Sequence, residues 1–265
     1  MSDHKIQKST AEELSSLKQD YLGGLIAPID GMWASFVSMA DHYAIMCGED
    51  VVGYTAINEE QIMLRFYVKK GHDQAAVFAQ IIDELSVKGA VVATQEIAYL
   101  SLCMDNQKSI SVNALLYRCD PDTEIEVVKF LDGLDFRGIT TEELQTAIDF
   151  AVAAIGAPED WLRGYYSERI ADEELFGLWR GEILIATGEC RPSADQKPYA
   201  DLGMVVSAEC RGQGLATAIL REMLNDCRDR ALSPICSTES TNVAARKAIT
   251  NAGFKSQTRI LEVGF

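Results

Sequence analysis

Apolar positions along this 265-residue chain follow two different spacings, and the spacings predict its elements. Recurrence every three or four residues is typical of helices, whereas alternating or short continuous apolar runs are typical of strands. The first half predicts helical segments within 12–39, interrupted near Gly23 and Pro28, and over 73–87. It predicts strands over 42–47, 51–57, 61–68, 90–94 and 110–117.

The second half repeats this order of elements. It predicts helices over 141–155 and 158–173, a hairpin of 175–179 with 183–188, a strand over 201–206, a helix from 215, a strand over 233–238 and a helix from 241 that ends at Gly253. We therefore expect an α/β (α+β mixed sheet) fold with two tandem domains, 1–122 and 123–265. The segment 124–130 is open to pairing with either half.

One stretch, 199–230, carries the clearest candidate chemistry. A buried strand, Asp201 to Val206, precedes a helix with one apolar face, formed by Leu215, Ile219, Leu220, Met223, Leu224 and Cys227. Between them lies the loop 211–216, Arg-Gly-Gln-Gly-Leu-Ala. Glycines allow a sharp turn, and the unpaired amides of a helix's first turn attract anions. The sequence therefore predicts a diphosphate site at this loop.

Two common phosphate loops do not match. A dinucleotide fingerprint needs a third glycine where this chain has Thr217, and a nucleotide-triphosphate loop needs Gly-Lys-Ser or Gly-Lys-Thr, which the chain lacks. The remaining pattern, R-x-x-G-x-A at 211–216, is followed after one helix and one strand by Asn242, Ala245 and a Gly253-Phe254 ending. Together these signatures resemble the GNAT superfamily of N-acetyltransferases. The tandem layout is also similar to that of zwittermicin-resistance-like acetyltransferases.

The resemblance implies direct transfer of an acetyl group from acetyl-CoA to an amine of a small molecule. It implies that backbone groups of Met204, Val205 and Val206 pair with the pantetheine arm. It assigns the pyrophosphate to Arg211, Gly212, Gln213, Gly214, Leu215, Ala216 and Thr217. Asn242 would reach the pantetheine arm or cap its own helix.

The acid and base of this reaction are less well marked. Asp201 and Glu239 are candidate proton acceptors, and Cys236, with Ser237 and Ser240, is a candidate donor. Many relatives carry a tyrosine acid where this chain has Ile249. The alternatives are that the thiolate leaves unassisted, or that the protein is a non-catalytic acyl-CoA-binding or interaction protein. Trp161, Tyr165 and Tyr166 are expected to be core or rim residues.

The charge and composition of the chain limit the classes of molecule that it is expected to bind. A formal charge of −16 and a pI near 4.6 argue against nucleic acid and favour a cationic substrate, or simply solubility. No apolar run is long enough for a membrane span, so we expect a soluble, cytoplasmic protein. Seven cysteines without a Cys-x-x-Cys motif predict buried thiols, with neither disulfides nor a metal. All three histidines, His4, His42 and His72, lie in the first half.

The first half lacks the anion loop. At the corresponding place it has 68–76, with one glycine, Gly71, and two lysines, Lys69 and Lys70. We therefore expect the first domain to be a degenerate copy that covers or shapes the substrate cleft of the second.

Overall fold

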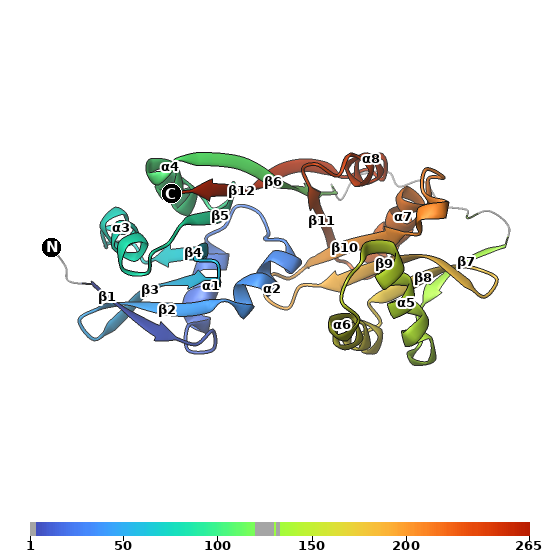
Figure 1. Cartoon of the computed structure of the whole chain (residues 1–265), viewed down its shortest axis with the longest axis horizontal. Coiled ribbons are helices and arrows are strands. Elements are labelled where there is room, and N and C mark those ends of the chain that lie inside the picture. Colours follow the sequence, from blue (N-terminus) through green and yellow to red (C-terminus); the bar gives the residue numbers. More distant parts are fainter. Residues whose placement is uncertain (1–3, 120–129, 131–132) are drawn as a thin grey trace. The chain divides into compact units, whose positions relative to one another are not determined.

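The computed structural model of this protein describes residues 4–119, 130 and 133–265 (Figure 1). The chain forms two compact units: unit 1 is Met1–Leu115 with Thr258–Phe265, and unit 2 is Leu116–Gln257. The expected boundary after residue 122 lies outside the described residues, as does the expected strand at 124–130 except for Phe130. The residues 258–265, which we expected in the second domain, belong to unit 1.

Unit 1 contains helices on an antiparallel meander that continues into a parallel pair. Its strand order is β1-β2-β3-β4-β5-β12, followed by β6. The elements along the chain are β1 (His4–Ser9), α1 (Ser15–Gly23), α2 (Gly31–Met39), β2 (Asp41–Cys47), β3 (Asp50–Ile57), β4 (Ile62–Val68), α3 (Gln74–Glu84), β5 (Gly89–Ala93), α4 (Ile97–Asn106) and β6 (Ser109–Arg118).

Unit 2 repeats this plan with the order β6-β11-β10-β9-β8-β7. After β7 (Leu134–Gly138), α5 (Leu144–Ile155) and α6 (Glu159–Ala171), the antiparallel strands are β8 (Leu175–Arg180), β9 (Ile183–Pro192) and β10 (Tyr199–Val206). The remaining elements of unit 2 are α7 (Leu215–Asp229), β11 (Ser233–Glu239) and α8 (Val243–Asn251). The last strand, β12 (Lys255–Gly264), belongs to unit 1 from Thr258 onward.

Alternating side chains of β9 face different helices in unit 2. A Cβ placed on Gly188 would meet Ile219 and Met223 of α7, whereas the next residue, Glu189, contacts Tyr165 of α6. The sheet of unit 2 is therefore covered by α7 on one face and by α5 and α6 on the other. All six apolar positions predicted for α7 are buried, which confirms that helix and its orientation.

The structure also contains elements that we did not predict: β1, α4, β7 and β12. Both β1 and β12 are rich in polar residues, because much of each strand is partly exposed. In α4 the buried residues are Tyr99, Leu102 and Cys103, a helical spacing that the sequence does contain. Across the described residues, no helix has both the length and the apolar character required to cross a membrane.

A polar cluster caps the short 3-10 helix η1 (Thr141–Glu143) that leads directly into α5. Thr140 and Glu143 form a reciprocal capping box, with the Thr140 amide donating to Glu143 Oε2 at 3.0 Å. The Arg137 guanidinium donates to both oxygens of the same carboxylate, at 2.9 and 2.6 Å. These bonds from Arg137 hold the pKa of Glu143 at about 2.

We expect Glu143→Gln to destabilise the protein by about 1 kcal/mol at pH 7, because a cap and a bidentate ion pair are lost together. The pKa of Glu143 is lower in the folded protein, so its stabilising effect is complete above the usual carboxyl range. It is lost as pH falls toward about 2. Denaturant unfolding at pH 7 and pH 3 should show a smaller difference at pH 3. Glu159→Gln, in an exposed pair with Arg163, is the control and should change stability by only a few tenths of a kcal/mol.

Candidate active site

Unit 2 contains a gap between two parallel strands. β10 pairs with β11 only over Tyr199–Asp201, opposite Ser233–Ile235, whereas its pairing with β9 continues to Val206. Within the described chain, the backbone groups of 202–205 on the β11 side therefore have no ladder partner. A free strand edge of this kind can bind an extended ligand through main-chain hydrogen bonds.

The loop after β10 is open and exposed. Gly212 and Gly214 have φ angles of +77° and +80°, which L side chains rarely adopt. A Cβ at either position would meet no atom within 4 Å, so the surface beside the backbone is free. Among the described residues, no acceptor is found for the amides of Leu215, Ala216 and Thr217 in the first turn of α7. Unpaired amides at a helix N-terminus, together with the helix dipole, are the groups that attract an anion such as a diphosphate.

Arg211 connects this loop to two other elements of unit 2 through hydrogen bonds. Its Nε donates to the Val206 carbonyl at 3.2 Å, and its Nη2 donates to the Ala154 carbonyl at 3.3 Å. Ala154 lies in the last turn of α5, where a cation is favoured by the helix dipole. The guanidinium remains exposed, so it adds positive charge beside the loop while positioning it.

Three other residues that were predicted to contact the coenzyme form side-chain hydrogen bonds within the protein. Asn242 Oδ1 accepts from the Ala245 amide at 3.0 Å and caps α8, one of the two roles considered for it. Thr217 Oγ1 donates to the Ala248 carbonyl at 3.3 Å, joining α7 to α8. The side chain of Gln213 donates to the Glu209 carbonyl at 3.3 Å, which leaves the loop's backbone amides exposed.

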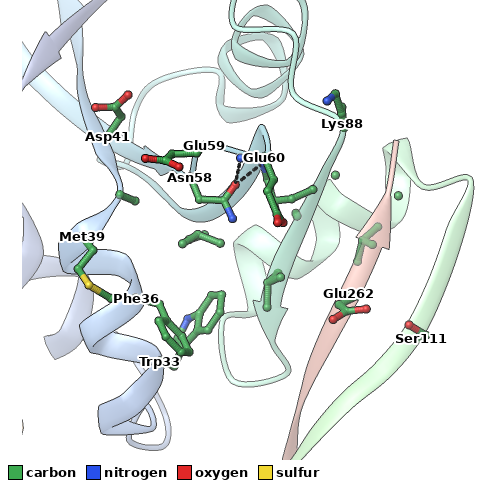
Figure 2. Close-up of a pocket in the computed structure, with 18 of the residues that line it drawn as sticks. Trp33, Phe36, Met39, Asp41, Asn58, Glu59, Glu60, Lys88, Ser111 and Glu262 are labelled. Carbon is green, nitrogen blue, oxygen red and sulfur yellow. Dashed lines mark hydrogen bonds between the residues drawn. The ribbon is translucent and has the colours of Figure 1, made fainter. Parts of the chain in front are cut away.

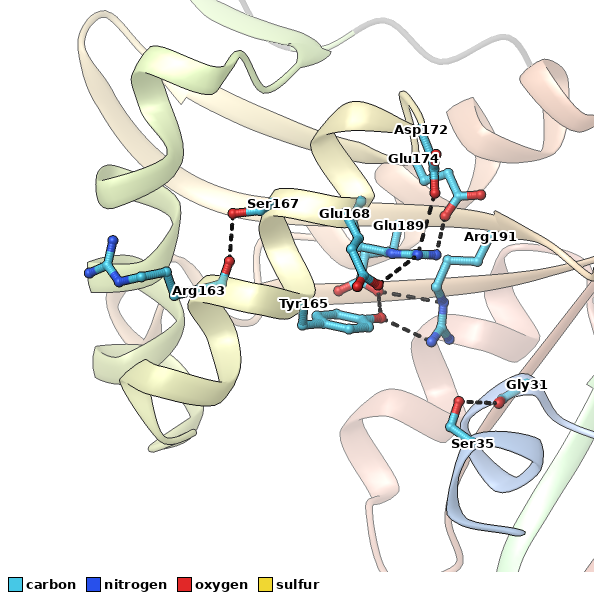
Figure 3. A network of polar contacts seen from close by, with 11 residues as sticks. Gly31, Ser35, Arg163, Tyr165, Ser167, Glu168, Asp172, Glu174, Glu189 and Arg191 are labelled. Carbon is cyan, nitrogen blue, oxygen red and sulfur yellow. Dashed lines mark hydrogen bonds and ion pairs between the residues drawn. The ribbon is translucent and has the colours of Figure 1, made fainter. Parts of the chain in front are cut away.

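A polar cluster lies beside β10 on the face covered by α6. Figure 3 shows the side chains of Tyr165, Glu189 and Arg191 pointing toward one another. The Tyr165 hydroxyl donates to Glu189 Oε2 at 2.6 Å and accepts from Arg191 Nη1 at 3.0 Å. Across β9 and β10, Glu189 is opposite Gly203 and Arg191 is opposite Asp201. Because Gly203 has no side chain, Glu189 lies directly against the β10 backbone.

Burial and neighbouring residues determine the protonation of Tyr165 and which side chains contact its ring. Burial, and then the negative charge of Glu189, raise the pKa of Tyr165, so its phenol stays protonated at neutral pH. Trp161 stacks on the Tyr165 ring with centroids 4.8 Å apart and is itself 47% exposed. Tyr166 is buried in the core, as expected, whereas Trp161 and Tyr165 form a rim beside Glu189.

The three predicted catalytic residues have different exposures. Asp201 is 3% exposed and faces the same side of the sheet as Glu189, and Cys236 is 4% exposed in β11. Glu239 is exposed at the end of β11. Ile249, at the position of the family's usual tyrosine, is 1% exposed and belongs to the core.

The sequence did not lead us to Glu189 and Arg191. The predicted hairpin ended at residue 188, whereas β9 continues to Pro192 and brings both side chains onto one face. The Glu-x-Arg alternation at 189–191 was the available signal.

In unit 1 the corresponding loop is closed to anions. The β4–β5 pairing is also short, at Ile62–Met63, but α3 begins with Asp73, whose carboxylate accepts from the Ala76 amide at 3.0 Å. A negative side chain thus occupies the helix terminus that a phosphate would need. This supports the expectation that the first domain is a degenerate copy.

Unit 1 nevertheless contains a pocket of about 1050 Å³ (Figure 2). One part of its wall is apolar, with Trp33, Phe36 and Met39 from α2. The charged residues of its lining are four acids and one base: Asp41, Glu59, Glu60, Glu262 and Lys88. The pocket therefore has an acidic lining, unlike the anion loop of unit 2.

Comparison with known proteins agrees with this arrangement. Family models match twice, an acetyltransferase (GNAT) domain over residues 10–120 and the acetyltransferase (GNAT) family over 140–254. A solved acetyltransferase from the GNAT family, from Colwellia psychrerythraea, is 38% identical to this chain. The match covers 98% of this chain and 99% of that one, with a TM-score of 0.93. The chain belongs to the GNAT family of acetyltransferases.

Two further structures share the GNAT fold at low identity. A GCN5-related N-acetyltransferase from Sphaerobacter thermophilus is 11% identical, with 98% and 94% of the two chains covered and a TM-score of 0.70. A tandem GNAT protein from the clavulanic acid biosynthesis pathway is 13% identical, with 98% of each chain covered and a TM-score of 0.71. A search of curated proteins found no match. The predicted mixed α/β fold with two tandem GNAT domains is confirmed, and similarity to zwittermicin-resistance acetyltransferases remains a prediction.

The glycine loop of this GNAT protein can be tested with two isosteric substitutions. We expect Gly214→Asp to weaken binding of acetyl-CoA by about tenfold or more, because its carboxylate would repel the diphosphate. Gly214→Asn is the matched control, since asparagine tolerates a positive φ equally well and carries no charge. Calorimetry on both variants measures the effect. Equal loss in both would point to backbone strain, and unchanged affinity in both would remove the loop from the coenzyme site.

Proposed function

We propose that this protein is an N-acetyltransferase that moves an acetyl group from acetyl-CoA to an amine of a small molecule, by direct attack in a ternary complex. The observation that carries the proposal is the end of β10–β11 pairing at Asp201, directly before a loop with unpaired amides. Along the chain, the free edge of β10 is thus followed directly by the open N-terminus of α7. They match an extended arm followed by a diphosphate, which is the chemical layout of coenzyme A.

The coenzyme would be held mainly by main-chain groups. The amides of 212–217, together with the positive charge of Arg211, would bind the diphosphate. The free edge around Met204–Val206 would pair with the pantetheine amides, as an added strand pairs with a sheet. Since Asn242 caps α8, its contribution would be to hold that helix in place, with the side-chain amide nitrogen left for the coenzyme.

The same strand edge would also assist the chemistry. An amide of β10 in the gap would donate to the thioester carbonyl, where negative charge develops as the amine attacks. The amine nitrogen would form a bond to the carbonyl carbon, and the carbon–sulfur bond would then break to release the thiolate. The protein's main contribution would be to orient the two reactants.

The attacking amine must first lose a proton, and Glu189 is the best-placed acceptor in the structure. It is partly accessible, it lies against the β10 backbone at Gly203, and Tyr165 donates to one of its oxygens. Asp201, predicted from the sequence, lies deeper on the same face and opposite Arg191, a position suited to orienting that cluster. Glu239 would serve through water if the amine approaches from the end of β11.

At the position where many relatives carry a tyrosine that donates a proton to the departing thiolate, this chain has the buried Ile249. Cys236 remains our candidate donor on β11. It is 4% exposed, so its approach to the coenzyme would be restricted.

The acceptor would be a cation in solution. The formal charge of −16 attracts amines at long range, and the exposed Trp161–Tyr165 stack beside Glu189 provides an aromatic surface next to a carboxylate.

A second candidate is a non-catalytic acyl-CoA-binding protein. The buried Ile249 favours it, since a coenzyme site without its usual acid would bind without reacting. Purified protein mixed with acetyl-CoA and a panel of small amines should release free thiol if the first proposal is correct. Tight acetyl-CoA binding with no thiol release on any amine would support the second.

We expect Glu189→Gln to lower kcat by about 10²-fold at neutral pH, with acetyl-CoA affinity unchanged, because the general base is removed. The deficit should shrink as pH approaches the pKa of the amine, which then loses its proton to solvent. Glu182→Gln, at the exposed turn of the same hairpin, is the control and should retain full activity. A deficit that is equal at every pH would assign Glu189 a positioning role instead.

A further inference from the structure

Three metal-ligating side chains meet in unit 1. His4 and Cys47 are paired across the antiparallel β1–β2 ladder, and His72 comes from the loop between β4 and α3 (Figure 1). The ligand atoms of the three side chains all lie within 4.8 Å of one another. The residues are remote in sequence, and nothing in the proposed acetyl transfer uses them.

The spacing of the two imidazoles suits a common metal ion. His4 Nε2 lies 3.3 Å from His72 Nδ1, and the rings meet edge-on at 72°. With zinc–nitrogen bonds of about 2.0–2.1 Å, two ligands of a tetrahedral zinc ion are separated by about 3.3 Å. The two nitrogens are therefore already at the separation that one shared ion requires.

A hydrogen bond between the two imidazoles would explain that contact alone. It would leave unexplained why the Cys47 sulfur lies beside the same two nitrogens. Two imidazoles and a thiol whose ligand atoms converge in this way form a ligand set that suits a cation of the zinc class, once the thiol has given up its proton. The geometry of all three residues therefore favours an ion over a simple histidine pair.

Two of the three ligands, His4 and Cys47, lie on paired strands. The β1–β2 pairing runs over all of His4–Ser9, and Gln80 of α3 donates to the His4 carbonyl at 2.9 Å. His4 itself is 5% exposed. A site built on paired strands loses little conformational freedom when it binds a metal.

We propose that His4, Cys47 and His72 bind a divalent transition-metal ion of the zinc class, with water as the fourth ligand. Imidazole and thiolate ligands suit zinc or cobalt, whereas calcium and magnesium require oxygen ligands. Across the described residues, no carboxylate joins this group of ligand atoms. The ion would bind after the Cys47 thiol releases its proton, and it would fasten strand β1 to the loop before α3.

The test uses the full-length, untagged protein after treatment with a chelator. Addition of Co²⁺ should produce a 1:1 complex with visible d–d bands and a thiolate-to-cobalt charge-transfer band. Addition of Zn²⁺ should displace the cobalt and raise the melting temperature, because the ion binds the folded state preferentially. Neither readout depends on acetyl transfer, so failure here leaves the proposed function unaffected.

Substitutions at the ligands and at matched control residues decide the assignment. Cys47→Ser should abolish the charge-transfer band, and His72→Asn should weaken zinc binding by at least about tenfold, since outer-shell changes alone cost 10–100-fold. Cys119→Ser and His42→Asn, outside the group, should retain the wild-type spectrum and affinity. Absence of a 1:1 cobalt complex, or a complex that survives Cys47→Ser unchanged, would overturn the proposal.

Discussion

The candidate active site of this GNAT protein depends on a strand pairing that ends part-way along β10. β10 and β11 form a parallel ladder up to Asp201 and Ile235, and no further. The loss of ladder hydrogen bonds over 202–205 has a cost unless another polar partner takes their place. Pairing with β9 up to Val206 holds β10 straight while its other edge remains available. The roles that we propose for the main chain of β10 follow from this one-sided pairing.

The neighbouring elements maintain that gap and add chemistry to it. Arg211 ties the glycine loop both to the end of β10 and to the end of α5, so the loop's amides are presented without side-chain cover. On the other face of the sheet, Gly203 allows Glu189 to approach the β10 backbone. The glycine loop therefore follows the end of β10, and the polar cluster of β9 and α6 lies beside the same strand.

Unit 1 shows how little is needed to remove the anion site. It has the corresponding strand order and a short β4–β5 pairing at Ile62–Met63, yet Asp73 caps the helix terminus with a carboxylate. A carboxylate cap that stabilises α3 disfavours a bound phosphate, because it occupies the Ala76 amide and brings negative charge to the same helix terminus. The tandem arrangement thus combines one open and one closed version of a single fold.

The sequence could predict features that depend on neighbours along the chain. The apolar face of α7, from Leu215 to Cys227, needs only helical spacing, and the loop 211–216 needs only its glycines and a following helix. The strand β9 was predicted too short, because polar residues at 189–191 look like a loop until α6 packs over them. The polar strands β1 and β12 were missed for a related reason, since their stability comes from neighbouring strands rather than from an apolar pattern.

By itself, the sequence determined the tandem α/β plan, the helix that follows the glycine loop 211–216 and the presence of Ile249 at the position of the family's usual tyrosine. Only the tertiary structure decided where β10 leaves β11, that Glu189 rather than Glu239 lies beside the strand, and that His4, Cys47 and His72 converge. The spacing of apolar residues in a short stretch of sequence indicates a helix or a strand, because this periodicity depends only on residues that are neighbours along the chain. Strand register and loop packing bring distant residues together, and these depend on contacts that no short window of sequence contains.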